Sequence, residues 1–166
     1  MVFRFEIMTE VSINKQARLS QHFTLGELCK TSAKTQDGNI PSHVHIENLK
    51  RLCGWLEMLR SEWNKRYGEG DDPIVINSGY RSEAVNKAVG GAKGSNHLTG
   101  CAADIRVAGM EQLVRYATIL LDISDESQED FDELLLERSP KGGYWLHFAV
   151  RPSDNRRKVR LIQSLR

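Results

Sequence analysis

The sequence has little that could crosslink the chain or anchor it in a membrane. Its 166 residues include three cysteines, Cys29, Cys53 and Cys101. Their odd number and wide spacing argue against a disulfide framework and predict reduced, buried thiols. No segment approaches the ~18 uninterrupted apolar residues that cross a bilayer, so we expect no membrane span.

The start of the chain also lacks the features of a signal peptide. Residues 1–11, MVFRFEIMTEV, have no basic start, no long apolar run and no small-residue cleavage site. We therefore expect synthesis in the cytoplasm. A substrate outside the cytoplasm would have to be reached by another route, such as cell lysis or a secretion device that releases the protein to the cell wall.

The chain has almost no excess charge of either sign. Lys and Arg total 23 against 22 Asp and Glu, so the formal net charge is +1. Such a chain has no long-range attraction for nucleic acid or an anionic membrane, and we expect neither as a partner. The length predicts one domain over residues 1–166, with a core large enough to fold without metal or disulfide, and we expect a monomer. Within it, residues 1–40 are weakly patterned, and the basic tail 151–166 has a weak helical pattern that we expect to be solvated.

Apolar residues recur at helical spacing in two segments. The first predicted helix begins at Pro41 and Ser42 and ends before YGEGDDP, residues 67–73. Its apolar positions are Leu49, Leu52, Cys53, Leu56, Leu59 and Trp63. The second predicted helix lies within residues 109–122, and the acidic stretch SDESQED, residues 124–130, is predicted to be a linker.

Three further segments have the patterns of β-strands. Residues 73–82, PIVINSGYRS, and residues 101–107, CAADIRV, are short runs rich in β-branched or small apolar residues. Between them, Ser82 is placed to cap a short helix that a glycine pair ends. Residues 131–150 predict a β-hairpin, because two apolar-rich runs flank a proline and a glycine pair.

Two histidines and an aspartate stand where these patterns could bring them together. His97 precedes Asp104 by seven residues in SNHLTGCAADI, residues 95–105. In the last strand, alternation sends Leu146, Phe148 and Val150 to one face and His147 to the other. Two imidazoles and one carboxylate suit Zn²⁺ and leave a fourth position for water, as in catalytic zinc sites.

The turn of the hairpin decides which acidic residue faces His147. A three-residue turn at residues 141–143 would place Glu137 directly across from His147, where it could take a proton from an activated water. A two- or four-residue turn would put a neighbour there instead. In this register Glu133 lies ~13 Å from Glu137 along the strand, too far to share the same water.

Each of these residues also has a structural interpretation. A His–Asp pair seven residues apart more often forms a loop hydrogen bond than a metal site. Glu137 could be a solvent-facing strand residue, and Arg81 a surface cation or a partner for Glu83. His43 and His45 fall at a helix start, where residues two apart do not face each other, and we interpret them as structural.

The motif resembles that of a known family. SNHLTGCAADI fits the Ser-x-His-x-x-Gly-x-x-x-Asp pattern of the M15 zinc peptidases, the D-Ala-D-Ala carboxypeptidases and L-alanyl-D-glutamate endopeptidases, whose fold is shared with Hedgehog signalling domains. LSQHFTLGELC resembles the opening of phage-type members, and INSGYRS resembles the segment before the first ligand. YWLHFAV resembles the strand that carries the last ligand.

The resemblance implies roles for particular residues. His97, Asp104 and His147 would bind zinc, and Arg81 would face the substrate and stabilise an oxyanion or a carboxylate. The catalytic glutamate of the family often stands three residues before the last histidine, where this chain has Tyr144. Members with a hairpin carry that glutamate on the preceding strand instead, and Glu137 is the residue that could match it.

The resemblance also implies a fold and a function. The fold would be α+β of the Hedgehog/DD-peptidase type, an antiparallel sheet with the helices packed on one face and the zinc site on the open face. The function would be hydrolysis of amide bonds in peptidoglycan stem peptides, either at the terminal D-alanine or within the stem. A zinc-stabilised binding module without turnover is the alternative, and a component of a phage lysis or tail apparatus is a third interpretation.

Overall fold

The computed structural model describes residues 13–163, so the expectation for the signal-peptide region, residues 1–11, lies outside the described residues. The elements in chain order are α1 (Leu25–Leu28), α2 (His43–Arg66), β1 (Ile76–Ser78), α3 (Glu83–Ala88), the 3₁₀-helix η1 (Asn96–Thr99), β2 (Ala102–Arg106), α4 (Met110–Ser127), β3 (Glu133–Arg138), β4 (Tyr144–Ala149) and β5 (Lys158–Gln163). The chain is thus α+β, as predicted.

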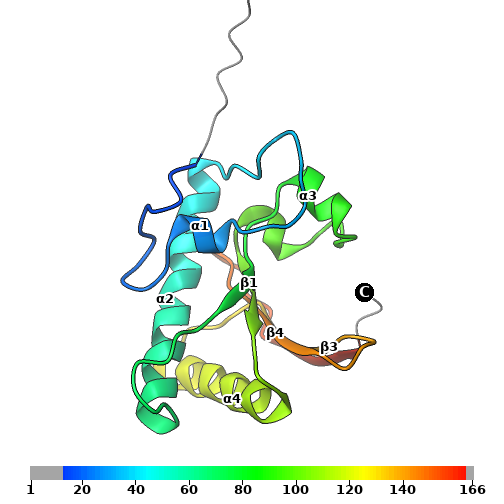
Figure 1. Ribbon diagram of the computed structural model, residues 1–166. Coiled ribbons are helices and arrows are strands. Elements are labelled where there is room, and N and C mark those ends of the chain that lie inside the picture. The colour runs from blue at the N-terminus through cyan, green and yellow to red at the C-terminus, as the bar shows by residue number, and fades with distance from the viewer. Residues whose placement is uncertain (1–12, 164–166) are drawn as a thin grey trace, which may run out of the picture.

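The strands form one sheet that is covered by helices on one face. The strand order is β1-β2-β4-β3-β5, and all neighbours are antiparallel except β3 and β5, which are parallel. Helix α2 runs along this face, and α4 crosses near its C-terminal end (Figure 1). Core side chains from both helices pack against the sheet, and they include Leu52, Leu56, Leu59, Leu113, Leu120, Ile105, Leu134, Leu146 and Phe148.

Both predicted helix caps are confirmed. The Ser42 side chain accepts a hydrogen bond from the His45 backbone N–H, and Ser82 does the same for Val85. The His45 imidazole in turn accepts from the Ser42 N–H and lies against Tyr80, with ring centroids 4.9 Å apart. His45 therefore has the structural role predicted for it.

The prediction of buried, reduced cysteines is confirmed, because Cys29, Cys53 and Cys101 are free and buried. No helix within residues 13–163 is both long enough and apolar enough to cross a bilayer.

Two predicted segments have a different structure. The prediction of a linker at residues 124–130 is wrong for the first four of these residues, because α4 continues to Ser127. Ile123 and Ser124 are buried, and the Ser124 hydroxyl donates to the Glu129 carbonyl. Local acidity suggested a linker, but burial against the sheet keeps this turn helical.

The tail is largely exposed, as predicted, but it is not helical. Its residues Lys158–Gln163 form β5, an edge strand parallel to β3, so the sheet is mixed and the expectation of a purely antiparallel sheet is wrong. An edge strand is exposed over much of its surface, which weakens the alternation by which a strand is recognised. The predicted strand within residues 73–82 ends at Ser78, as the Ser-Gly pair predicts, but it is shorter at its start, since only Ile76–Ser78 pair with β2.

The hairpin between β3 and β4 closes one residue earlier than predicted. Ser139 and Gly143 are paired, with the Ser139 N–H donating to the Gly143 carbonyl at 2.8 Å, and Gly142 has a φ of 86°. The turn is therefore residues 140–142, a three-residue turn with glycine in the left-handed region. This shift places Leu135 across from His147 and Glu137 across from Trp145. The predicted Glu137–His147 pair is wrong. Because a turn that closes one residue earlier changes each cross-strand partner by two positions, Glu137 stays on the same face of the sheet as His147.

Candidate metal centre

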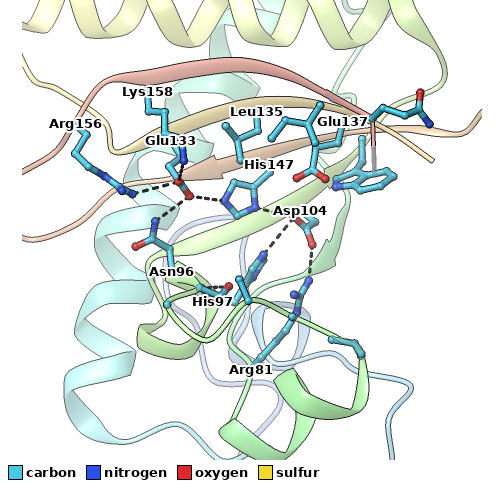
Figure 2. A pocket seen from close by; sticks show the side chains of 18 residues that line it. Arg81, Asn96, His97, Asp104, Glu133, Leu135, Glu137, His147, Arg156 and Lys158 are labelled. Carbon is cyan, nitrogen blue, oxygen red and sulfur yellow. Dashed lines mark hydrogen bonds and ion pairs between the residues drawn. The ribbon is translucent and has the colours of Figure 1, made fainter. Parts of the chain in front are cut away.

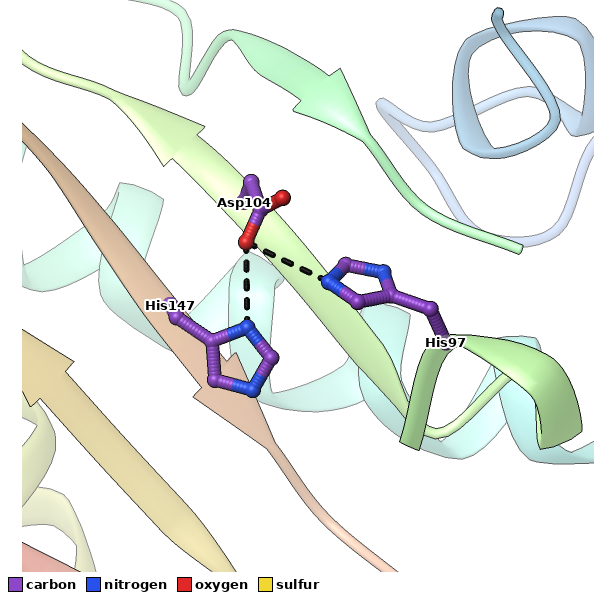
Figure 3. Close-up of side chains that lie close together, drawn as sticks. All are labelled: His97, Asp104 and His147. Atoms are coloured by element: carbon purple, nitrogen blue, oxygen red, sulfur yellow. Dashed lines mark hydrogen bonds and ion pairs between the residues drawn. The ribbon is translucent and has the colours of Figure 1, made fainter. Parts of the chain in front are cut away.

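Three side chains from three elements converge on the sheet face opposite the helices. His97 comes from η1, Asp104 from β2 and His147 from β4. Asp104 and His147 lie directly across from each other in the β2–β4 ladder. Asp104 Oδ1 lies 3.3 Å from His97 Nε2 and 3.0 Å from His147 Nδ1 (Figure 3). The sequence prediction that these residues meet is borne out by the geometry.

These three residues fit a small divalent cation. Their donor atoms all lie within 4.8 Å of one another. Ligands ~2.0–2.1 Å from a tetrahedral zinc ion lie about 3.3 Å apart, close to the two separations that involve Asp104 Oδ1. Two imidazoles and one carboxylate are also a donor set of catalytic zinc, with room for a further ligand.

Backbone contacts fix His97 in this position. Ser95 caps the start of η1, because its hydroxyl accepts a hydrogen bond from the His97 N–H. Gly100 ends η1 in the left-handed conformation, with a φ of 73°. The His97 Nδ1 atom lies 2.6 Å from the Gly79 carbonyl oxygen. Nδ1 therefore carries the proton and donates, which leaves Nε2 to face Asp104.

Gly79 cannot carry a side chain without displacing its neighbours. A Cβ atom there would lie 2.3 Å from the Leu28 carbonyl oxygen. We expect Gly79→Ala to lower the free energy of unfolding by about 1–3 kcal/mol, because the clash is with backbone that must move. Thermal denaturation measures this, with Gly70→Ala as the control, since no atom lies within 4 Å of a Cβ at Gly70. An unchanged melting temperature in Gly79→Ala would contradict the close packing described.

Arg81 is bound to the cluster and is not a surface cation. Its Nη2 atom lies 2.6 Å from Asp104 Oδ2, and its Nε donates to the Ser78 hydroxyl at 2.9 Å. Its side chain is 13% exposed. Arg81 thus holds one carboxylate oxygen of Asp104 and leaves the other to the histidines. The partner that the sequence analysis considered, Glu83, is replaced here by Asp104.

Loss of Arg81 should weaken both the fold and the cluster. We expect Arg81→Ala to lower the melting temperature by several degrees, because a charge-assisted hydrogen bond contributes ~1.5–3 kcal/mol. We also expect kcat/KM on a stem peptide to fall. Differential scanning calorimetry and steady-state kinetics test this, with the exposed Lys34→Ala as the control. A variant with unchanged stability and unchanged kcat/KM would show that the Arg81–Asp104 pair contributes neither.

Two glutamates flank His147 on this face. A cavity of about 690 Å³ is lined by Arg81, His97, Asp104, Glu133, Glu137 and His147, among others. Figure 2 shows the Glu137 carboxylate on the Asp104 side of His147 and the Glu133 carboxylate on the opposite side. Both are diagonal neighbours of His147 across the β3–β4 ladder.

Tyr144 is not placed to act in the cluster. It lies three residues before His147, so alternation directs it to the other face of β4. Its side chain accordingly packs against the hydrophobic core. The position that most often carries the glutamate in the resembling family therefore points away from the cluster in this chain.

Glu133 also contacts the cluster, which the sequence patterns did not predict. Its Oε2 atom lies 3.3 Å from His147 Nε2, although the predicted register placed it too far from the site. Alternation already put Glu133 on the correct face. The sequence did not predict its contact with His147 because the hairpin turn lies one residue before the predicted position.

The charges in the cluster depend on one another. Burial raises the pKa of Asp104, but the two imidazoles beside it outweigh this effect and hold that pKa well below its usual range. Burial lowers the pKa of His97, and the neighbouring Asp104 acts in the opposite direction. Burial also lowers the pKa of His147, but the Asp104 and Glu133 carboxylates beside it raise it to about 9. Because metal ions bind neutral imidazole, a cation held by this cluster would bind His147 in its neutral form.

Comparisons with known proteins agree with the motif. A family model described as Peptidase M15 matches residues 21–123, a span that contains Arg81, His97 and Asp104 and ends before β3. A zinc D-Ala-D-Ala carboxypeptidase from Streptomyces albus G is 32% identical over 84 residues, which cover 51% of this chain and 31% of that relative. The match thus spans about a third of the curated relative. Because the family model covers more than half of the sequence, the chain belongs to the Peptidase M15 family.

Proposed function

We propose that the protein is a zinc-dependent peptidase that hydrolyses amide bonds in peptidoglycan stem peptides. The observation that carries this proposal is the convergence of His97, Asp104 and His147 donor atoms in a cavity. Membership of the Peptidase M15 family and the similarity to a zinc D-Ala-D-Ala carboxypeptidase support the metal and the substrate class. The fold we propose is the Hedgehog/DD-peptidase type, with zinc on the face that the helices leave open.

The residues of the site would divide the chemistry among them. Zinc held by His97, Asp104 and His147 would lower the pKa of water toward neutrality and polarise the scissile carbonyl. Arg81 holds the Asp104 carboxylate by an ion pair, and its guanidinium borders the cavity where a substrate carboxylate or an oxyanion could lie.

Glu137 is our proposed general base. It lines the cavity on the Asp104 side of His147 (Figure 2), and a carboxylate there could accept the proton of the attacking water and pass it to the leaving amine. Glu133, the other glutamate of the cavity, contacts His147 and Lys158. We propose that the two carboxylates have different roles, with Glu137 as the base.

The experiment is digestion of purified peptidoglycan and of soluble stem peptides, followed by mass spectrometry of the released ends. We expect metal-dependent cleavage that a chelator stops and zinc restores. Loss of one D-alanine would identify a carboxypeptidase, and a new internal end would identify an endopeptidase. The opening segment, which resembles phage-type members, makes wall degradation during lysis part of this proposal, and lysis of intact cell walls tests it.

One observation favours a second candidate function. The hairpin register takes Glu137 out of the position directly across from His147, which weakens the case for a base next to the metal. A zinc-stabilised binding module of the same fold would then be the function. Retention of zinc and binding of stem peptides without any metal-dependent cleavage would support this candidate over the peptidase.

A further inference from the structure

We propose that Glu133 is a positioning residue that orients His147 for metal binding, and that β5 at the C-terminal end of the described chain holds Glu133 in place. This inference rests on the proposed zinc site. It adds Glu133, a residue that is not one of the metal ligands. It also gives the C-terminal tail a role in the site, which the sequence patterns did not predict.

The His147 ring lies between two carboxylates. Its Nδ1 faces Asp104 Oδ1 at 3.0 Å and its Nε2 faces Glu133 Oε2 at 3.3 Å. The residue is 7% exposed, and within residues 13–163 its buried Nε2 makes no aligned hydrogen bond. The Glu133 carboxylate faces this nitrogen at ion-pair distance. Histidines that bind metals usually give their second ring N–H to such a carboxylate or to a backbone carbonyl.

The other histidine of the cluster already has its partner of this kind. His97 presents Nε2 to Asp104, while its Nδ1 lies 2.6 Å from the Gly79 carbonyl oxygen. Glu133 would orient the His147 ring through Nε2, as the Gly79 carbonyl orients the His97 ring through Nδ1. With both rings fixed from behind, Nε2 of His97 and Nδ1 of His147 are directed at the same carboxylate oxygen of Asp104.

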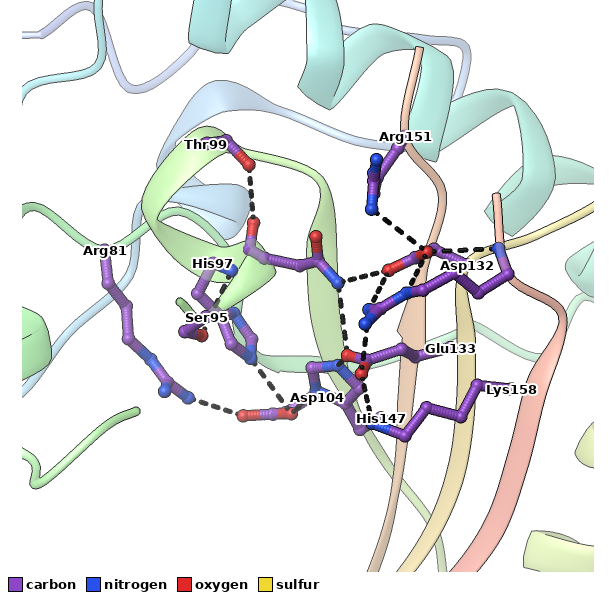
Figure 4. A network of polar contacts seen from close by, with 12 residues as sticks. Arg81, Ser95, His97, Thr99, Asp104, Asp132, Glu133, His147, Arg151 and Lys158 are labelled. Atoms are coloured by element: carbon purple, nitrogen blue, oxygen red, sulfur yellow. Dashed lines mark hydrogen bonds and ion pairs between the residues drawn. The ribbon is translucent and has the colours of Figure 1, made fainter. Parts of the chain in front are cut away.

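Glu133 is itself held at both oxygens. Lys158 Nζ lies 2.9 Å and Arg156 Nη2 lies 3.2 Å from Glu133 Oε1, and Asn96 Nδ2 donates to Oε2 at 3.1 Å (Figure 2). Figure 4 shows Lys158 and Glu133 within the same polar network. Lys158 is the residue of β5 that pairs with Glu133 in the parallel ladder. The carboxylate is 13% exposed, so these contacts fix its direction with little competition from water.

Asp132 holds the Arg156 guanidinium, which also contacts Glu133. Arg156 donates to Asp132 through Nε at 2.8 Å and Nη2 at 2.6 Å, and Asp132 is fully buried. Asn96 also donates to Asp132, at 2.7 Å. Because Asn96 precedes His97, the same network ties the element that carries His97 to the strand that carries Glu133.

These contacts favour positioning over proton transfer for Glu133. A general base needs a lone pair aimed at the reacting water, but the two oxygens of Glu133 face Lys158, Arg156, Asn96 and His147. Glu133 is therefore placed to orient His147, and its oxygens are not directed at a water in the cavity.

The test is zinc affinity, measured by competition with a chromophoric chelator of known affinity. We expect Glu133→Gln to bind zinc about 10- to 100-fold more weakly than the parent protein, the usual effect of removing an outer partner of a ligand histidine. Lys158→Met should show a smaller loss in the same direction. Glu126→Gln, on the exposed side of α4, is the matched control and should bind zinc like the parent.

Each outcome separates this inference from the proposed function. If the parent binds no zinc, both fail. If the parent binds zinc and a folded Glu133→Gln binds it equally well, only the positioning role is overturned. Parent-like affinity with hydrolysis reduced 100-fold or more would make Glu133 the general base and would also overturn positioning. If Glu133→Gln does not fold, by circular dichroism, Lys158→Met decides: weaker zinc binding supports the inference, and unchanged binding overturns it.

Discussion

Replacement of His97 or His147 by alanine is expected to remove zinc from the protein and to abolish hydrolysis of stem peptides. Each histidine supplies one of three donor atoms that lie within 4.8 Å of one another, and three protein ligands are the usual minimum for catalytic zinc. The loss of affinity should exceed the ~100-fold that removal of an outer partner causes. Metal analysis after dialysis measures it.

The control for these variants is His43→Ala. His43 is an exposed residue in the first turn of α2, far from the cluster in sequence and on another element. It should retain one zinc ion per chain. Full zinc content in either His97→Ala or His147→Ala, with the fold intact by circular dichroism, would show that the ion binds elsewhere.

The second large effect is expected for Glu137→Gln, which should retain zinc and lose hydrolysis by ~10²- to 10⁴-fold, the usual contribution of a general base. The amide has nearly the shape of the carboxylate but cannot take up a proton at neutral pH. The measurement is kcat/KM on a soluble stem peptide, with zinc content determined on the same sample. Glu47→Gln, at an exposed position of α2, is the control.

Two results would contradict the role of Glu137. Hydrolysis at the parent rate would place the base elsewhere, and Glu133→Gln would then be the next variant to examine. Loss of zinc in Glu137→Gln would show that the carboxylate supports the ligands and does not transfer a proton. Tyr144→Phe should keep parent activity, since this side chain packs against the core on the other face of β4.

Local patterns predict the faces on which the cluster residues lie, and the resemblance to the M15 peptidases implies that these residues meet. Alternation in β4 sends His147 away from Leu146 and Phe148, and the spacing in SNHLTGCAADI places His97 just before the strand of Asp104. The two main helices were predictable for the same reason, since their apolar residues repeat every three or four positions.

The residues around the cluster depend on tertiary contacts that local patterns do not carry. The hairpin turn could begin at residue 140 or at residue 141. A turn that begins at residue 140 places Leu135 across from His147, and one that begins at residue 141 would place Glu137 there. The pairing of Lys158 with Glu133 joins β3 to a tail whose charges resemble those of a solvated segment. The Arg81–Asp104 contact likewise depends on the way β1 and β2 meet.

The most direct measurement of the central claim is a zinc titration of chelator-treated protein, with hydrolysis of a stem peptide as the signal. The account predicts no hydrolysis without metal and a linear rise that levels off at one zinc ion per chain. Hydrolysis that persists after complete removal of metal, or a fully zinc-loaded protein that cleaves no stem peptide, would contradict it.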